Sequence, residues 1–150
     1  MSLEKKLGMA TRDAYGKAIA ALGKTNPDIV VLDADLSKST KTEFFAKECP
    51  ERFIECGIQE SNMAGVAAGL ALAGLKPFIN SFACFLMCKT YDQLRMSVAF
   101  PELNVKAIGS HGGISVGEDG ASQQSIEDFA LACSLPNFFS SDILTFYLLL

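Results

Sequence analysis

The feature of this 150-residue sequence that most constrains its fold is a regular alternation between short apolar runs and helical segments. The run at residues 29–32 is continuously apolar, which is typical of a strand buried on both faces. Strands are predicted at 29–32, 53–55, 77–81 and 105–108. Helices are predicted at 11–23, around Phe44 and Phe45 up to Pro50, at 60–74, at 82–100 and at 122–133. This alternation predicts an α/β fold with a doubly wound parallel sheet flanked by helices.

Individual residues mark the ends of the predicted helices. Thr11 is suited to cap the first helix, and Pro50 is suited to end the second. Gly74 is suited to the position that follows the helix at 60–74. That helix consists almost wholly of Ala, Gly, Leu and Val, so we expect it to be buried on all sides.

The composition argues against several classes of function. The formal net charge is −4 and the basic residues are scattered, so we expect no nucleic-acid partner. The longest uncharged apolar stretch, at 63–75, is too short to span a membrane, and no secretory signal is visible. The five cysteines form no C-x-x-C pair, which predicts reduced thiols, a cytoplasmic location and no metal site within the chain.

In a doubly wound sheet, the loops that follow the strands build the functional site. Two features of these loops have more than one interpretation. Glu60 opens the most apolar helix, where its carboxylate is either simply stabilised by the helix dipole or held beside a buried ligand for proton exchange. Phe82 and Phe85 follow a strand end three residues apart. They are either core residues or a stacking platform for a flat heterocycle.

Two further loops carry polar residues. The loop at 109–120 contains the only histidine, His111, together with Asp119 and five glycines, and it does not match a P-loop. A loop of this length with these residue types is typical of a functional segment. Arg12 and the loop at 33–40 offer hydroxyls and cations that suit a phosphate, or they form a solvated polar surface.

Five stretches in order carry a resemblance to a known family. They read ATR at 10–12, DADL at 33–36, GIQESNM at 57–63, SFACFL at 81–86 and GEDGASQ at 117–123. Together they resemble the pyrimidine-binding central domain of transketolases, and most closely the C-terminal chain of split transketolases. The resemblance covers about residues 9–137. We therefore expect 1–137 to form this domain and 138–150 to be an atypical apolar tail at the end of a truncated chain.

The resemblance implies how a cofactor would be held. Glu60 corresponds to the glutamate that hydrogen-bonds the aminopyrimidine ring of thiamine diphosphate and relays a proton there. Phe82 and Phe85 correspond to the aromatic residues that pack on that ring. Asp35 corresponds to the acid near the thiazolium ring.

The resemblance also implies substrate contacts. Arg12, Ser39 and His111 match positions that hold the sugar phosphate, and Asp119 matches an acid that contacts a substrate hydroxyl. Gln123 stands where many members have His, another hydroxyl contact. Because Gln occurs there in some members, this difference bears on the range of substrates more than on activity.

At the level of function, the resemblance implies a transketolase component of the pentose phosphate pathway that transfers a two-carbon ketol unit between sugar phosphates. The implied cofactors are thiamine diphosphate and Mg²⁺ or Ca²⁺, with the metal ligands supplied by an N-terminal chain that carries the diphosphate-binding domain. A homodimer or heterotetramer is expected, and the isolated chain is expected to be inactive. Deoxyxylulose-phosphate synthase and the β subunit of α-ketoacid dehydrogenases share this domain. A non-catalytic assembly module is the alternative from another class.

Overall fold

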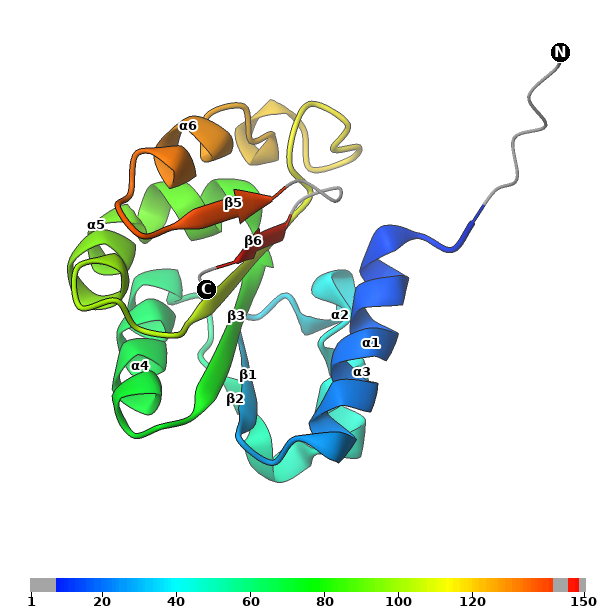
Figure 1. Cartoon of the computed structure of the whole chain (residues 1–150). Coiled ribbons are helices and arrows are strands. Elements are labelled where there is room, and N and C mark those ends of the chain that lie inside the picture. Colours follow the sequence, from blue (N-terminus) through cyan, green and yellow to red (C-terminus); the bar gives the residue numbers. More distant parts are fainter. Residues whose placement is uncertain (1–7, 142–145, 149–150) are drawn as a thin grey trace, which may run out of the picture.

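The computed structural model describes residues 8–141 and 146–148, which form a six-stranded sheet in the order β2-β1-β3-β4-β6-β5. Four strands are parallel: β1 (Ile29–Asp33), β2 (Phe53–Glu55), β3 (Lys76–Phe82) and β4 (Lys106–Ser110). The strand β6 (Phe146–Leu148) pairs antiparallel with β4, and β5 (Phe139–Ser141) pairs antiparallel with β6. The predicted parallel sheet is confirmed, and the antiparallel edge is an addition to it (Figure 1).

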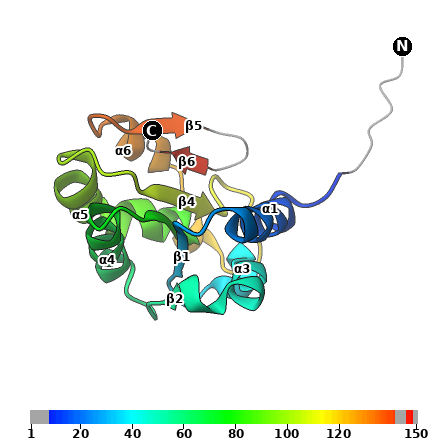
Figure 2. The same cartoon turned by 60° about the horizontal axis from the view of Figure 1, so that its bottom comes forward.

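Helices cover both faces of this sheet (Figure 2). One face carries α1 (Thr11–Thr25) and α3 (Glu43–Glu48), and the other carries α4 (Glu60–Leu72) and α5 (Tyr91–Gln93). The short α2 (Ser37–Thr40) precedes α3, and α6 (Asp128–Cys133) precedes β5. Strand β1 is buried along its whole length because its side chains alternate between two cores: Val30 and Leu32 pack on the α4 side, and Ile29 and Val31 on the α1 side.

Several local predictions are confirmed and others are wrong. Gly74 follows α4 with a φ of 92°, the left-handed conformation that favours glycine. Thr11 is not the cap of α1, because Ala10 takes that position without a side-chain hydrogen bond. The helix predicted at 122–133 is a 3₁₀ turn at Ala121–Gln123 followed by α6. The segment predicted as one helix at 82–100 contains two π-helical pieces, η2 (Phe85–Lys89) and η3 (Leu94–Ala99), on either side of α5.

The helix α4 is not buried on all sides, contrary to the prediction from its composition. Met63 and Ala67 are buried against the sheet, whereas Gly65, Gly69 and Leu72 are exposed. The predicted tail at 138–150 enters the sheet through β5 and β6, while 142–145 and 149–150 lie outside the described residues. The domain boundary at 137 stays a prediction.

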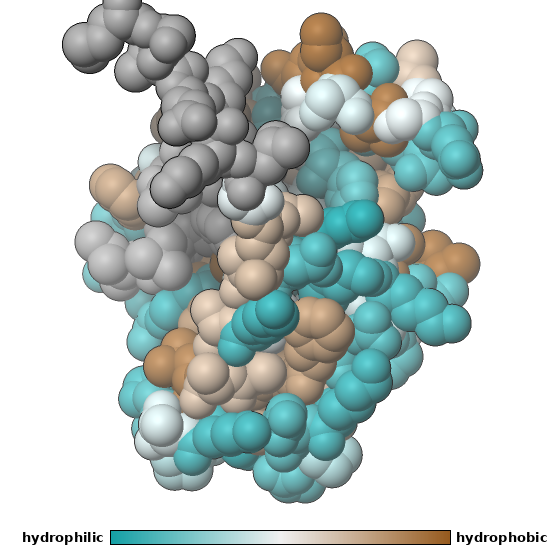
Figure 3. Space-filling view, turned by 90° about the vertical axis from the view of Figure 1, so that its right-hand side faces the viewer, coloured by the Kyte–Doolittle hydropathy of each residue, from teal (hydrophilic) through white to brown (hydrophobic). Residues whose placement is uncertain are grey.

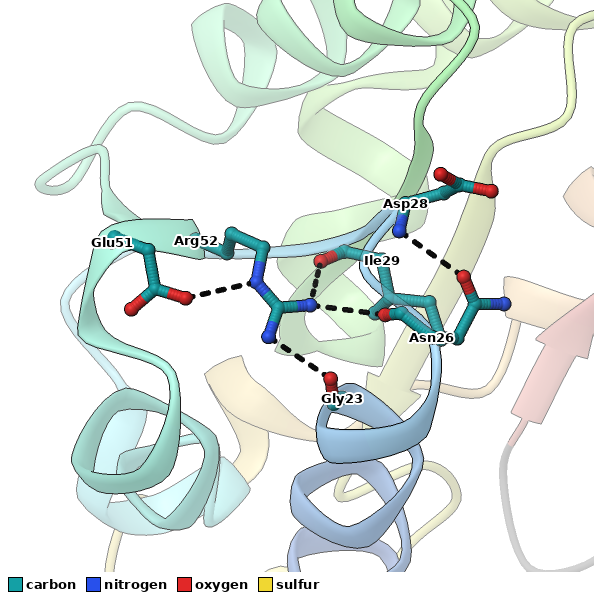
Figure 4. A network of polar contacts seen from close by, with 6 residues as sticks. All are labelled: Gly23, Asn26, Asp28, Ile29, Glu51 and Arg52. Atoms are coloured by element: carbon teal, nitrogen blue, oxygen red, sulfur yellow. Dashed lines mark hydrogen bonds and ion pairs between the residues drawn. The ribbon is translucent and has the colours of Figure 1, made fainter.

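Arg52 ties the end of α1 to the start of β1 (Figure 4). Its guanidinium donates to the backbone oxygens of Gly23 at 2.9 Å, Asn26 at 3.0 Å and Ile29 at 3.3 Å. It also contacts the carboxylate of Glu51 at 3.0 Å. These carbonyls belong to the end of α1, to the turn after it and to the first residue of β1. Backbone acceptors at a helix end lack helical partners. The one side chain therefore fixes the angle at which the chain enters the sheet.

Replacing Arg52 with Met is expected to lower the free energy of unfolding by about 2 kcal/mol, because part-buried carbonyls lose charged donors. Urea denaturation of the two proteins measures the difference. Arg95→Met is the matched control, since Arg95 is exposed and its guanidinium contacts Met96 Sδ at 3.2 Å. Equal losses in the two variants would show that the Arg52 contacts carry no special stability.

Candidate active site

The polar residues at the carboxyl ends of the parallel strands surround a cavity of about 620 Å³. Arg12 and Tyr15 reach it from α1, Asn80 from β3, and Ser110 and His111 from the end of β4. The site expected at this edge of the sheet therefore includes a cavity. Arg12 and His111, which are 99 positions apart in the sequence (111 minus 12), both line this cavity, and the Arg12 charge acts on His111.

Burial and nearby charges together determine the pKa of His111. Its pKa is lowered from the ordinary 6.5, first because burial disfavours the charged ring and then because the Arg12 guanidinium repels the proton. The Asp119 carboxylate acts in the opposite direction, toward a higher pKa. His111 Nδ1 lies 2.9 Å from Ser110 Oγ, and the residue has a φ of 57°. A basic wall with a neutral imidazole at neutral pH is suited to an anionic ligand.

The titration of His111 tests this arrangement directly, because the chain contains a single histidine and so gives one set of imidazole proton signals. We expect NMR to show a pKa below 6.5, a rise in Arg12→Gln and a further fall in Asp119→Asn. The Arg12→Gln value should stay below 6.5 because burial is the larger cause. A wild-type pKa at or above 6.5 would contradict the burial of the ring.

The lowered pKa of His111 also makes the stability of the folded chain depend on pH. Because folding lowers the pKa of His111, the unfolded chain binds this proton more tightly than the folded chain. The stability that the residue contributes is therefore present above pH 6.5 and is lost as the pH falls through the folded pKa.

An aromatic group adjoins the cavity. The rings of Phe82 and Phe85 stack with centroids 5.8 Å apart and planes 10° apart. The His111 ring lies 4.1 Å from Phe82, centroid to centroid, so the aromatic pair and the basic wall are in contact. Phe82 is buried and Phe85 is only partly buried. Phe85 is therefore the member of the pair with a face available to a flat ligand.

Glu60 is the first residue of α4 and is only 2% exposed. Its Oε2 lies 2.5 Å from the Nζ of Lys89, the last residue of η2. The same Nζ lies 5.5 Å from the centroid of the Phe85 ring. Glu60 and Phe85 thus converge on one ammonium group, which shows that a small group can contact both residues at once.

The remaining predicted site residues lie in the segments that follow β1 and β4. Asp35 is exposed, has a φ of 63°, and donates its backbone N–H to Glu55 Oε1 at 2.8 Å. Ser39 is in α2, Asp119 is exposed in the loop after β4, and Gln123 ends the 3₁₀ turn. None of these side chains lines the cavity within the described residues, whereas Arg12 and His111 do.

Sequence reasoning missed a buried polar network beneath the site. Asp33, fully buried, accepts hydrogen bonds from the Leu36 N–H and from the hydroxyls of Thr40 and Thr42, each at 2.7 Å. Burial raises its pKa, and those hydrogen bonds oppose the rise. Asn80 accepts from the Tyr15 hydroxyl at 2.6 Å. The available signal was local for Asp33, which ends β1 and is followed within nine positions by Thr40 and Thr42. The Tyr15 partner of Asn80 is 65 positions away and leaves no local pattern.

Apolar side chains surround the mouth of the cavity. Ile114 is 75% exposed and Ile126 is 78% exposed, and Ile126 also lines the cavity. Viewed from the side of α1, strongly apolar side chains lie at the top of the molecule, where Figure 1 places the loop after β4 (Figure 3). Exposed apolar side chains next to a polar site are typical of a surface that a partner covers.

Within residues 8–141 and 146–148 there is no cluster of three or more His, Cys, Asp or Glu side chains arranged to hold a metal ion. Nor does any helix there have the length and apolar character needed to cross a membrane.

The sequence comparisons agree with the resemblance noted above. The profile of the family described as the pyrimidine binding domain of transketolase matches residues 8–146. A protein of Methanocaldococcus jannaschii named for a transketolase C-terminal section is 51% identical over 126 residues, which cover 84% of this chain and 40% of that protein. Human transketolase is 46% identical over 138 residues, which cover 89% of this chain and 22% of the human protein.

Solved structures give the same result. One titled as the inactive β4 tetramer of a split-gene transketolase is similar with a TM-score of 0.75 and 53% identity, over 90% of this chain and 44% of that one. The transketolase of Campylobacter jejuni is similar with a TM-score of 0.78 and 31% identity, over 89% of this chain and 22% of that one. The chain therefore spans less than half the length of each of these relatives.

Proposed function

Because the chain belongs to the transketolase pyrimidine-binding domain family, we propose that it supplies the aminopyrimidine side of a thiamine-diphosphate active site for two-carbon ketol transfer between sugar phosphates. The observation that carries this proposal is the convergence of Glu60 and Phe85 on the Lys89 ammonium, at 2.5 Å and 5.5 Å. A buried carboxyl and an aromatic face at these distances fit the polar edge and the flat face of an aminopyrimidine ring.

Each residue near the ring then has a defined task. Glu60 holds a proton at the ring nitrogen that faces it, and its burial keeps water from competing for that hydrogen bond. Phe85 supports the flat face of the ring, and Phe82 holds Phe85 in place by stacking. We assign Asp35 to the side of the thiazolium ring. Thiamine diphosphate, when bound, supplies the carbanion-stabilising chemistry.

The cavity beside the aromatic pair is suited to the sugar phosphate. Arg12 and His111 both line this cavity, so the guanidinium and the imidazole can donate hydrogen bonds to a phosphate. We assign Ser39 to the same phosphate, and Asp119 and Gln123 to hydroxyls of the sugar. A dianionic ligand would also favour protonation of His111, so phosphate binding should be accompanied by proton uptake.

A second chain is part of this proposal. The name of the M. jannaschii relative refers to a C-terminal section, and the split-gene structure is titled inactive, which supports dependence on another polypeptide. We assign the diphosphate-binding domain and the ligands of Mg²⁺ or Ca²⁺ to an N-terminal transketolase chain. The apolar mouth of the cavity and the exposed face of α4 are surfaces that such a chain could cover. A homodimer or heterotetramer and a cytoplasmic location remain predictions.

The test mixes this chain with the N-terminal chain, thiamine diphosphate and Mg²⁺, and follows ketol transfer from xylulose 5-phosphate to ribose 5-phosphate. We expect transfer in the mixture and none from either chain alone. Consumption of pyruvate in place of xylulose 5-phosphate would favour deoxyxylulose-phosphate synthase or an α-ketoacid dehydrogenase. A stoichiometric complex without turnover on any of these substrates would favour a non-catalytic assembly module.

A further inference from the structure

Lys89 was not among the residues that the sequence singled out, yet the structure places it against the proposed catalytic carboxyl. Its ammonium lies 2.5 Å from Glu60 Oε2, and Glu60 is 2% exposed while the Lys89 side chain is 48% exposed. A buried carboxylate that pairs with a half-exposed cation keeps its negative charge compensated. The two residues are 29 positions apart, so the contact is tertiary.

The backbone of Lys89 is fixed at the start of α4. Ser61 Oγ donates to the Lys89 carbonyl oxygen at 2.7 Å, which places this lysine next to the residue that follows Glu60. Lys89 ends the π-helical turn η2 that Phe85 begins, and its ammonium lies 5.5 Å from the Phe85 ring centroid. The ammonium therefore contacts both groups to which we assign the aminopyrimidine ring.

The Glu60 carboxyl cannot pair with the Lys89 ammonium and donate a hydrogen bond to a ring nitrogen at the same time. A carboxylate in an ion pair is ionised and only accepts hydrogen bonds, whereas a ring nitrogen with a lone pair needs a donor, which means a protonated carboxyl. Among the described residues, Lys89 from η2 forms the ion pair with Glu60. Burial is the first cause that raises the pKa of the Cys84 thiol just before η2, and the Glu60 charge contributes to the same rise.

We propose that Lys89 is a positioning residue that occupies the Glu60 carboxylate in the cofactor-free chain and has to release it when an aminopyrimidine ring binds. This inference rests on the proposed function and deepens it. Because nearly half of the Lys89 side chain is exposed, its ammonium can move into solvent while its backbone stays bound to Ser61. The ion pair thus protects a buried charge before binding and competes with the ring during binding.

Amine labelling followed by mass spectrometry tests the ion pair in the single chain. An ammonium held against a carboxylate is engaged in a charge-assisted hydrogen bond and is less accessible to an acylating reagent than a free one. We expect the labelling rate of Lys89 to rise severalfold in Glu60→Gln, while Lys24, which pairs with Glu48 at 2.8 Å on the surface, keeps its rate as the internal reference. An unchanged Lys89 rate would overturn the proposal.

Calorimetric titration of thiamine diphosphate into the assembled two-chain complex tests the competition. Lys89→Met is expected to tighten the dissociation constant about tenfold, and Lys89→Arg, which retains a cation, to stay near wild type. A dissociation constant for Lys89→Met that is unchanged or larger than that of wild type would overturn the proposal.

In wild type, binding of the cofactor should also raise the labelling rate of Lys89, a measurement that does not depend on how a variant folds. A wild-type complex that binds no thiamine diphosphate would refute the proposed function, and the single-chain labelling would still decide whether Glu60 holds Lys89.

Discussion

Replacing Glu60 with Gln should lower ketol-transfer turnover in the assembled complex by a factor of about 10²–10⁴, the usual range for loss of a positioned acid or base. Glutamine has nearly the same shape, so packing at the start of α4 is retained. It cannot donate and recover a proton at the ring nitrogen as a carboxyl does. Steady-state rates at saturating thiamine diphosphate separate the loss of this proton transfer from a loss of cofactor affinity.

The matched control for this variant is Glu48→Gln. Glu48 also pairs with a lysine, Lys24, at 2.8 Å, but both side chains are about half exposed. Surface pairs of this kind contribute little to stability, so we expect wild-type turnover from Glu48→Gln. If Glu60→Gln retained turnover within a factor of about three of the control, the proton-transfer role of Glu60 would be wrong.

Replacing Asp33 with Ala should be the most damaging change to the fold. We expect the free energy of unfolding to fall by about 3–4 kcal/mol, because the substitution orphans the Leu36 N–H and the hydroxyls of Thr40 and Thr42. These donors are buried or partly buried, so water does not readily replace the lost acceptor. Denaturant titration monitored by circular dichroism measures the loss.

Asp28→Ala provides the comparison for Asp33→Ala. Asp28 pairs with Lys76 at 2.9 Å, but its side chain is 50% exposed. We expect this substitution to cost less than about 1 kcal/mol. Asp28 directly precedes β1 and Asp33 is its last residue, so a difference between them reports burial and hydrogen bonding and not the general position in the chain. Similar losses would mean that the network under the site contributes no stability of its own.

The network around Asp33 also affects the site. Thr40, one of its donors, lines the cavity and ends α2, the helix that contains Ser39. Loss of the Asp33 acceptor should therefore loosen the part of the cavity wall to which we assign the sugar phosphate, in addition to destabilising β1. A measurement of activity alone would not separate these two effects. The free energy of unfolding of the variant is therefore measured first.

Much of the fold could be predicted from the sequence because its signals are local. A continuously apolar run such as 29–32 has few interpretations other than a strand buried on both faces, and Pro50 and Gly74 end helices by their own backbone geometry. The antiparallel pairing of β6 with β4 depends on contacts between residues about 40 positions apart, which no local pattern encodes. The π-helical turns in the segment predicted as one helix have the same hydrophobic pattern as an α-helix, so periodicity cannot distinguish them.

The candidate site, too, could be predicted from the sequence only in part. The loops that carry Glu60, Phe82, Phe85 and His111 could be identified because they follow strands. The meeting of Arg12 with His111 and the pairing of Glu60 with Lys89 could not, because each depends on the distance between segments that only the folded chain defines. The raised pKa of Asp33 could not either, because it depends first on burial in the folded chain.

The most direct test of the central claim is equilibrium binding of thiamine diphosphate, in the presence of Mg²⁺, to this chain alone, to the N-terminal chain alone and to their equimolar mixture. We predict saturable binding of one cofactor per pair in the mixture, no saturable binding to this chain alone, and markedly weaker binding when the mixture contains Glu60→Ala. Binding by the mixture that Glu60→Ala leaves unchanged would contradict the assignment of the aminopyrimidine ring to this chain.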